Sequence, residues 1–304
     1  MENKTIEKLE FNKIRKILSD FAVTTLGKNL STNLMPINTL TAINKAQKQT
    51  SEASTLLYRK GSVPISEVED ITVSVKKLSS NQFLSCKQLL DLANILRTAN
   101  NLKLYFFSNE IDMSEFTNLY DIFNNLYENK NIEKTIFSLI LDENTINDEA
   151  SSSLKNIRKD IKNKEQEIRN KLNSLIHSKY IQEPVVTIRS GRFVIPVKNE
   201  YRSEIKGFIH DVSSSGSTVF IEPLTIFDMN NDLNNLKIAE NIEIEKILER
   251  LSSLFFNIIS ELENDVNLIG LIDFIFAKAK YSNFLDATEP IVTTEKIINL
   301  KEII

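Results

Sequence analysis

Five basic side chains fall within eighteen residues of this sequence, close to a serine-rich run. The basic residues are Arg189, Arg192, Lys198, Arg202 and Lys206, and the neighbouring hydroxyls belong to Ser214, Ser215 and Ser217. Cations, hydroxyls and free backbone amides can hold phosphate oxygens without reading bases, so these eight residues are the predicted nucleic-acid-binding set. Acidic residues are interspersed with them, at Glu183, Glu200, Glu204, Asp211 and Glu222. A solvated sheet face is therefore an equal alternative, because phosphate binding needs clustered cations.

A second basic segment precedes this one and offers another candidate surface. It contains Lys155, Arg158, Lys159 and Lys162. The segment from Leu224 to Asp265 is acidic, and pairing with it would neutralise these cations. That pairing is the favoured interpretation.

Residues for catalysis or metal binding are scarce. The two histidines are His177, expected near a helix end, and His210, expected in a strand with a structural hydrogen bond. One cysteine, Cys86, completes no zinc set and excludes an internal disulfide, which fits a reducing compartment. Gly27-Lys28 lacks the first glycine of a phosphate loop. The sequence therefore predicts no catalytic residue, metal or cofactor site, and a non-enzymatic chain.

Composition narrows the class of protein further. The 304 residues carry a formal net charge of −4, so any nucleic-acid contact must be local. The sequence has no run of about 18 apolar residues and no apolar N-terminal signal region, which predicts no membrane span and a cytoplasmic location.

The elements that must position these residues follow from hydrophobic spacing. Apolar residues recur at helical spacing through 1–146, where Ser85 is a predicted cap of a strong helix. The segment 147–264 has three predicted parts. A narrow apolar stripe predicts a long helix of about 30 residues. A block of short strands follows at 184–223, and then a second long helix from Leu224 to Val266. An apolar helix follows within 265–304.

The two long helices carry opposite charge. Between Ser152 and Tyr180 there are eight basic and three acidic residues, whereas Leu224 to Asp265 has three basic and nine acidic. Helices joined by a small strand block run antiparallel, so we expect them to pair as a coiled-coil arm.

Within 184–223, turn residues separate four predicted strands. Ser190-Gly191 joins Val185–Arg189 to Arg192–Val197 as a two-residue hairpin. Ser213 to Ser217 joins Gly207–Val212 to Thr218–Ile221 as a looser turn. Pro196 cannot donate to a strand ladder, so we expect it at an edge or a strand end.

The stretch TIRSGRFVIPVKNEYRSEIKGFIHDVSSSGSTVFIEP, followed by IFDMNNDLNNL, resembles the clamp region of the MutS family, MutS-II branch. LEFNKIRKILSDFAVTTLGKNL near the N-terminus and IDFIFAKAKY near the end are also similar to that branch. The resemblance implies a mainly α fold: a helical core and lever domain at 1–146, an antiparallel coiled-coil arm at 147–264 with a β-sheet clamp at its tip (184–223), and a return to the core at 265–304.

The resemblance also implies domains that this chain lacks. Family members continue into an ATPase domain that binds ATP and Mg and forms the homodimer, and members of this branch commonly end in a Smr nuclease domain. The chain stops at INLKEII, where the ATPase connection is expected to begin. Phe220-Ile221-Glu222 matches the letters of a mismatch-reading motif, and we interpret the match as coincidence.

Two functions follow as expectations. In the first, the chain is a clamp module that contacts branched or double-stranded DNA, or the ribosome and its rRNA, through backbone and shape. The parent protein would then suppress recombination or act in ribosome rescue. In the alternative, the chain is a structural lever or self-associating coiled coil that transmits ATPase state without binding nucleic acid.

Overall fold

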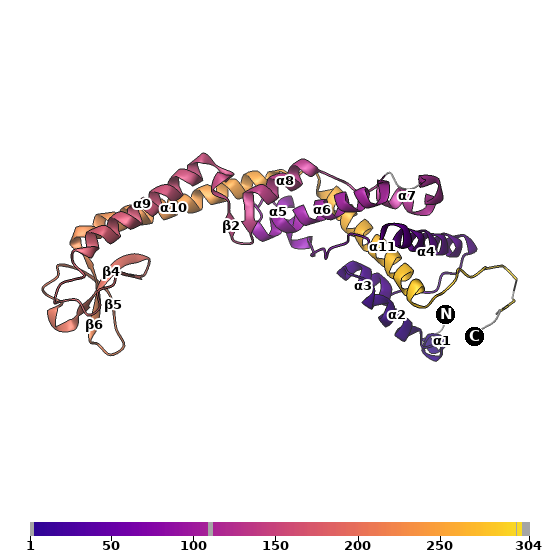
Figure 1. Ribbon diagram of the computed structural model, residues 1–304, viewed down its shortest axis with the longest axis horizontal. Coiled ribbons are helices and arrows are strands. Elements are labelled where there is room, and N and C mark those ends of the chain that lie inside the picture. Colours follow the sequence, from indigo (N-terminus) through magenta and orange to yellow (C-terminus); the bar gives the residue numbers. More distant parts are fainter. Residues whose placement is uncertain (1–2, 109–111, 296, 300–304) are drawn as a thin grey trace. The chain divides into compact units, whose positions relative to one another are not determined.

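The computed structural model describes residues 3–108, 112–295 and 297–299. The chain divides into two compact units, one formed by 1–144 with 251–304 and the other by 145–250. The structure is mainly helical with short antiparallel strands (Figure 1), which confirms the mainly α prediction. No helix in the described ranges is long and apolar enough to cross a membrane.

The first unit is built from helices. In chain order they are α1 (Asn3–Lys8), α2 (Phe11–Asp20), α3 (Thr25–Thr32), α4 (Leu40–Lys60), α5 (Thr72–Ser79), α6 (Cys86–Phe107), a 3-10 turn (Met113–Glu115), α7 (Thr117–Asn124), α8 (Lys130–Leu139) and α11 (Ile259–Phe284), with strand β1 (Ile140–Asp142) after α8. The predicted cap of α6 is confirmed, because Ser85 and Gln88 form a reciprocal capping box.

Helix α11 lies at the centre of this unit and packs against α3, α4 and α6. Its Asp273 is fully buried and accepts hydrogen bonds from the backbone nitrogens of Val23 and Thr24. A Cβ at Gly27 would lie 2.3 Å from Asp273 Oδ2, and one at Gly270 would lie 2.5 Å from Leu26. The two glycines therefore permit the close approach of α3 and α11.

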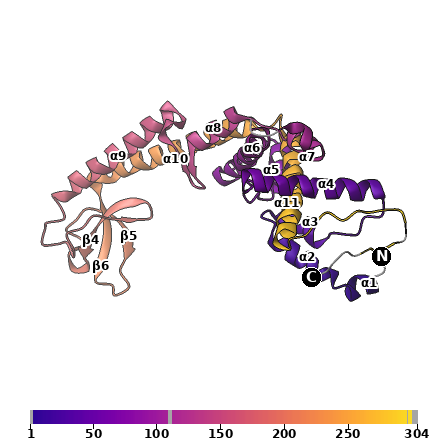
Figure 2. The same cartoon turned by 45° about the vertical axis from the view of Figure 1, so that its right-hand side comes forward.

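The second unit combines β2 (Thr145–Ile146), a 3-10 turn (Asp148–Ala150), α9 (Ser152–Asn173), four further strands and α10 (Leu224–Ser253). Helices α9 and α10 run side by side in opposite directions in both ribbon views (Figures 1 and 2). The expected pairing of basic α9 with acidic α10 is observed in two ion pairs, Arg158–Glu240 at 2.7 Å and Lys164–Asp232 at 3.5 Å. A third pair between the helices, Lys237–Glu165 at 3.4 Å, has the opposite polarity.

The four further strands of this unit form one antiparallel sheet in the order β3-β4-β6-β5. They are β3 (Thr187–Arg189), β4 (Arg192–Lys198), β5 (Gly207–Val212) and β6 (Thr218–Pro223), with a 3-10 turn (Asn199–Tyr201) after β4. Both predicted hairpin pairings are confirmed. One sheet face packs on α9 and α10 through a buried cluster that includes Phe193, Ile195, Ile221, Ile168 and Leu233.

Pro196 does not lie at an edge or a strand end, and that expectation is wrong. It occupies the interior of β4, an inner strand. Strand β3 pairs with β4 only as far as Val194, and the Pro196 carbonyl accepts instead from Gln182 beyond that point. Pro196 has no N–H, so only its carbonyl takes part in the pairing with Gln182.

The expected continuous helix from Leu224 to Val266 is also wrong, because α10 ends at Ser253 and α11 begins at Ile259. Phe255 is fully buried in the break, and Ser252 Oγ accepts a hydrogen bond from Leu84 N at 2.8 Å. Helix α9 has 22 residues rather than about 30, since the chain turns after Asn173. Packing of single side chains, which periodicity does not report, sets these ends.

Candidate nucleic-acid interface

The β3–β4 hairpin places two of the predicted cations directly opposite one another. Ser190 and Gly191 have φ of 49° and 76°, and two successive positive values are typical of a tight type I′ turn. The turn pairs Arg189 with Arg192. Like charges facing each other destabilise a sheet, so each arginine needs its own counter-charge.

Arg189 finds its partners on the sheet surface. Its Nε lies 3.2 Å from Asp211, and its guanidinium lies 4.2 Å from the centre of the Phe220 ring. The side chain is 39% exposed. Arg189 can therefore still contact a ligand, but Asp211 reduces its effective charge.

Arg192 is bound inside the unit by a buried carboxylate. Its Nε and Nη2 each lie 2.8 Å from an oxygen of Glu222, whose side chain is fully buried. His210 Nε2 lies 2.6 Å from Glu222 Oε2, and Asn230 Nδ2 donates to Glu222 Oε1 at 2.8 Å. Burial opposes ionisation of Glu222, but the hydrogen bonds from Arg192, Asn230 and His210 outweigh it and lower the pKa of this carboxyl.

This buried cluster joins the sheet to α10. Asn230 of α10 accepts from Phe193 N at 3.1 Å and donates to Phe193 O at 3.0 Å. His210 reaches Glu222 because a bulge between Ile209 and Asp211 offsets it from the β5–β6 ladder. Arg192 therefore holds the sheet together, and using it for phosphate would leave Glu222 without its charge partner.

The strand register separates the predicted residues into two groups. Arg192 begins β4 and Lys198 ends it, so their backbones are roughly 20 Å apart at about 3.3 Å per residue. Arg189 lies beside Arg192, and the Lys206 carbonyl accepts from Leu224 at that same end. Lys198 lies opposite Thr218, next to the loop from Ser213 to Ser217, which we call the serine loop. The predicted set is therefore not one continuous patch.

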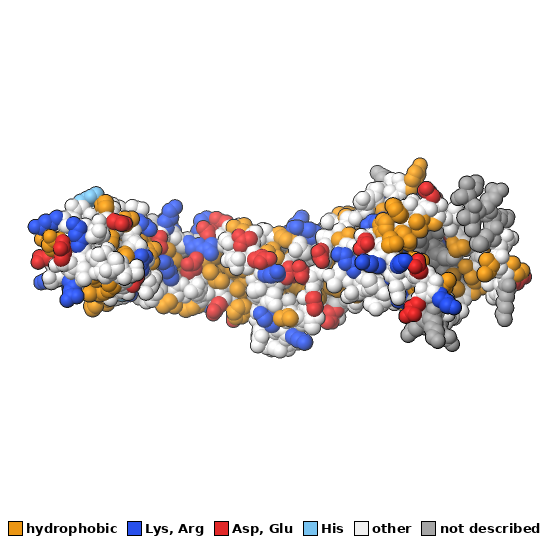
Figure 3. All heavy atoms as spheres, turned by 90° about the horizontal axis from the view of Figure 1, so that it is seen from below, with side chains coloured by type: hydrophobic (Ala, Val, Ile, Leu, Met, Phe, Trp, Pro, Cys, Tyr) orange, Lys and Arg blue, Asp and Glu red, His pale blue; other side chains and the backbone are white. Residues whose placement is uncertain are grey.

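The end of the sheet with Lys198 has the more accessible groups. Arg202 is exposed and follows the turn after β4, where its backbone nitrogen donates to Asn199. Ser214, Ser215 and Ser217 are exposed, and Ser215 and Ser217 share a hydrogen bond of 2.8 Å. Figure 3 shows acidic and basic side chains interspersed on the surface formed by this sheet.

Some of the basic residues of α9 form ion pairs within the unit. Arg158 contacts both Glu240 and Asp148, and Lys155 contacts Glu149. Lys159 and Lys162 are exposed. The predicted neutralisation by the acidic helix is thus observed for Arg158, whereas Lys159 and Lys162 remain accessible.

Metal-ligating side chains are not gathered in the described part of the chain. No cluster of three or more His, Cys, Asp or Glu side chains suitable for a metal occurs there. His177 is exposed, and His210 has the structural hydrogen bond that the sequence predicts. Gly27 serves helix packing, which accounts for the Gly27-Lys28 pair without phosphate chemistry.

The role of Glu222 is not among the predictions made from the sequence. The sequence marked Glu222 as one of the interspersed acids and as part of Phe220-Ile221-Glu222, yet it is the centre of the buried polar cluster. One available signal was its position in β6, two residues after Phe220 and hence on the same sheet face, with a histidine and an arginine in the neighbouring strands.

No protein-family model matches the chain. Among curated proteins it is similar to proteins named "Endonuclease MutS2": 42% identical to one from Acetivibrio thermocellus, 38% to one from Clostridioides difficile and 36% to one from Alkaliphilus oremlandii. Each alignment covers 99% of this chain but only 38–39% of the relative. The chain thus spans less than two fifths of the proteins it matches.

Proposed function

This chain is a relative of the MutS2 proteins and so belongs to the MutS family, and we propose that it is the lever and clamp part of a longer MutS2-type protein. We further propose that it contacts nucleic acid through the sheet of its second unit. The paired helices α9 and α10 would be the arm, and the four-stranded sheet would be the clamp. The proposed partners are branched or double-stranded DNA, or the ribosome and its rRNA. The longer protein would act in the cytoplasm, dimerise through an ATPase domain that binds ATP and Mg, and carry nuclease activity.

The proposed nucleic-acid contact is supported by the side chains at the end of the sheet near the serine loop. Lys198 lies there opposite Thr218, which directly follows the loop with exposed Ser214, Ser215 and Ser217, and exposed Arg202 follows the turn after β4. Lys198 Nζ donates only to the Lys179 carbonyl among the residues described, at 3.3 Å, and carries no ion pair. Cations with adjacent hydroxyls suit phosphate oxygens and carry no base code, which fits binding by shape and backbone.

The test is the double substitution Lys198→Ala with Arg202→Ala, measured by fluorescence anisotropy on a four-way DNA junction and by co-sedimentation with ribosomes. Losing two phosphate contacts should reduce the slope of log K against log salt by about 2. Lys45→Ala with Lys76→Ala removes the same charge from exposed helix positions in the other unit and is the matched control. Unchanged affinity of the Lys198/Arg202 variant for both ligands at low salt would refute the contact.

One observation favours the alternative of a purely structural lever. Arg189, Arg192 and Arg158 all have carboxylate partners within their own unit. On that proposal the chain binds neither ligand, and deleting 145–250 from the longer protein uncouples its ATP hydrolysis from binding. Measuring both binding and ATPase stimulation by DNA and by ribosomes in that deletion separates the two functions: a lever predicts that binding is retained and stimulation is lost, whereas a clamp predicts that binding is weakened as well.

A further inference from the structure

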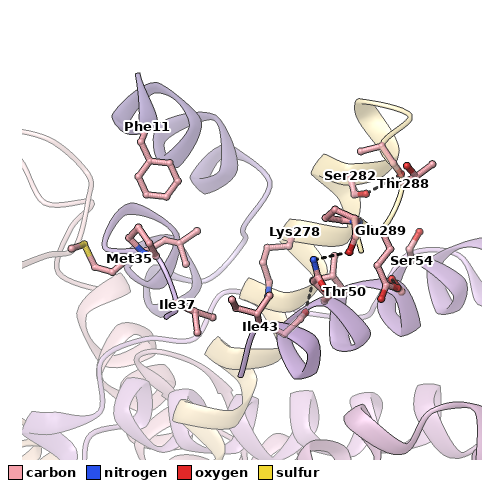
Figure 4. Close-up of a pocket in the computed structure, with 17 residues that line it drawn as sticks. Phe11, Met35, Ile37, Ile43, Thr50, Ser54, Lys278, Ser282, Thr288 and Glu289 are labelled. Atoms are coloured by element: carbon pink, nitrogen blue, oxygen red, sulfur yellow. Dashed lines mark hydrogen bonds between the residues drawn. The ribbon is translucent and has the colours of Figure 1, made fainter. Parts of the chain in front are cut away.

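A cavity of about 720 Å³ lies in the first unit and is not part of the proposed interface. Its walls come from α2, the segment between α3 and α4, the first half of α4, the end of α11 and the segment that follows α11 (Figure 4). Phe11, Leu34, Met35, Ile37 and Ile43 make much of the lining apolar. Met35 and Ile37 are 55% and 43% exposed, which is unusual for apolar side chains gathered at one concave site.

One cation in this apolar wall lacks a counter-charge. Lys278 of α11 lines the cavity (Figure 4), and its Nζ has no hydrogen bond or ion pair with any residue that the structure describes. The Nζ lies over the Phe274 ring, 4.8 Å from the ring centre. Burial lowers the pKa of Lys278 to about 8, because the charged form has lost water and gained no partner.

The acid in the same wall does not supply that counter-charge. Glu289 lies 3.0 Å from Lys48 Nζ and accepts a hydrogen bond from Ser51 at 2.7 Å. The hydrogen bonds from Ser51 and Lys48 lower the pKa of Glu289. Its charge is therefore already matched, and the walls keep one unpaired positive group.

A second cation borders the cavity at the side of α2. Arg15 lies 4.7 Å over the Phe11 ring and donates to Met35 Sδ at 2.9 Å, so it contacts two wall residues. Its Nε is buried without a hydrogen-bond partner among the described residues. Both unmatched groups are positive, so charge complementarity selects an anionic ligand.

We propose that this cavity binds a small amphipathic carboxylic acid, whose carboxylate pairs with Lys278 and whose hydrocarbon part packs against Met35, Ile37 and Ile43. The volume is within the range of about 300–1,000 Å³ that small-molecule sites occupy, and the lining has the usual character of apolar walls with a few polar groups. A carboxylate completes the ion pair that the lysine lacks in the free protein. An uncharged amphiphile would gain the apolar contact alone.

The test uses decanoate as the probe and isothermal titration calorimetry on the 304-residue chain, with 1-decanol as the uncharged comparison. Lys278→Met keeps an unbranched side chain that is one atom shorter and removes its charge. We expect it to weaken decanoate binding about tenfold or more, the loss of one charge-assisted contact, with decanol binding changed by less than about threefold. Lys45→Met, an exposed position on α4 that does not line the cavity, is the control and should bind decanoate like the unsubstituted chain.

A second variant keeps the proposal testable without altering the lysine. Ala46→Phe adds bulk to the cavity wall and should weaken both probes, whereas the lysine substitution should separate them. Two results would overturn the assignment: absence of decanoate binding to the unsubstituted chain at millimolar concentration, or equal affinity of Lys278→Met and the unsubstituted chain for decanoate. Binding of a peptide segment in place of either probe would also overturn it.

Discussion

Asp265 gives the sharpest prediction about stability, because it is an acid buried with only half of its hydrogen bonding satisfied. The side chain is fully buried on α11. Oδ1 accepts from Tyr127 N at 2.8 Å, whereas Oδ2 has no partner among the described residues. Burial raises the pKa of Asp265 from 3.8 to about 7, against the smaller lowering by the Tyr127 hydrogen bond and by Lys103.

The sign of the effect follows from the raised pKa. Between about pH 4 and pH 7 the folded chain holds a proton on Asp265 that the unfolded chain has lost, so stability falls as the pH rises through this window. The difference between 3.8 and about 7 corresponds to roughly 4 kcal/mol at about 1.36 kcal/mol per pH unit. Below pH 4 the protonated acid contributes its full stability, and above pH 7 the loss is complete.

The perturbation is Asp265→Asn, which keeps the oxygen that accepts from Tyr127 and removes the ionisation. Urea unfolding followed by far-UV circular dichroism at pH 4 to 8 gives the free energy of unfolding of both proteins. The variant should gain about 4 kcal/mol relative to the unsubstituted chain between the two ends of this range, since all other titrating groups are shared. Asp121→Asn, at an exposed position on α7, is the control. A difference for Asp265→Asn that stays constant within about 1 kcal/mol from pH 4 to 8 would refute the reasoning.

Two other predictions concern packing and the buried ion pair. Gly27→Ala should reduce the free energy of unfolding by about 2–4 kcal/mol, because the new Cβ would lie 2.3 Å from Asp273 Oδ2 and disrupt its hydrogen bonds. Asn29→Ala, on the exposed face of α3, is the control and should have little effect. Comparable losses for the two variants would contradict the packing role of Gly27. Glu222→Gln should cost about 3 kcal/mol in the same measurement by leaving Arg192 without its charge partner. Because the pKa of Glu222 is lowered, its ionised form stabilises the fold at pH values above its ordinary pKa of 4.5, and this stabilisation decreases as the pH falls below 4.5. Equal loss of stability in acid for Glu222→Gln and the unsubstituted chain would contradict this pH dependence.

The two hairpins and the charge pairing of α9 with α10 were predictable because they depend on local or averaged properties. Ser190-Gly191 favours a two-residue turn whatever surrounds it, and the turn then sets the register of β3 and β4. The opposite charges of the two long segments are sums over many residues, so single errors do not change their sign. The MutS resemblance, now supported by relatives 36–42% identical, likewise rests on a long stretch of sequence.

Whether each cation faces solvent or an acidic partner was not predictable, because residues close in sequence need not cluster in space. Arg192 and Lys198 are six positions apart in one strand, and an extended backbone separates them further than a helix would. Whether Arg192 points to solvent or to Glu222 depends on the bulge at His210 and on Asn230 from α10, which are contacts across the fold.

The sequence by itself therefore determined the mainly helical class, the four strands of the sheet and the pairing of two oppositely charged helices, since periodicity, turn residues and net charge are local or additive quantities. Only the tertiary structure decided which charges are matched. It buried Glu222 with Arg192, left Lys278 and one oxygen of Asp265 without partners among the described residues, and used Gly27 for close helix packing. The physical reason is that desolvation and partner geometry are set by residues far apart in the chain.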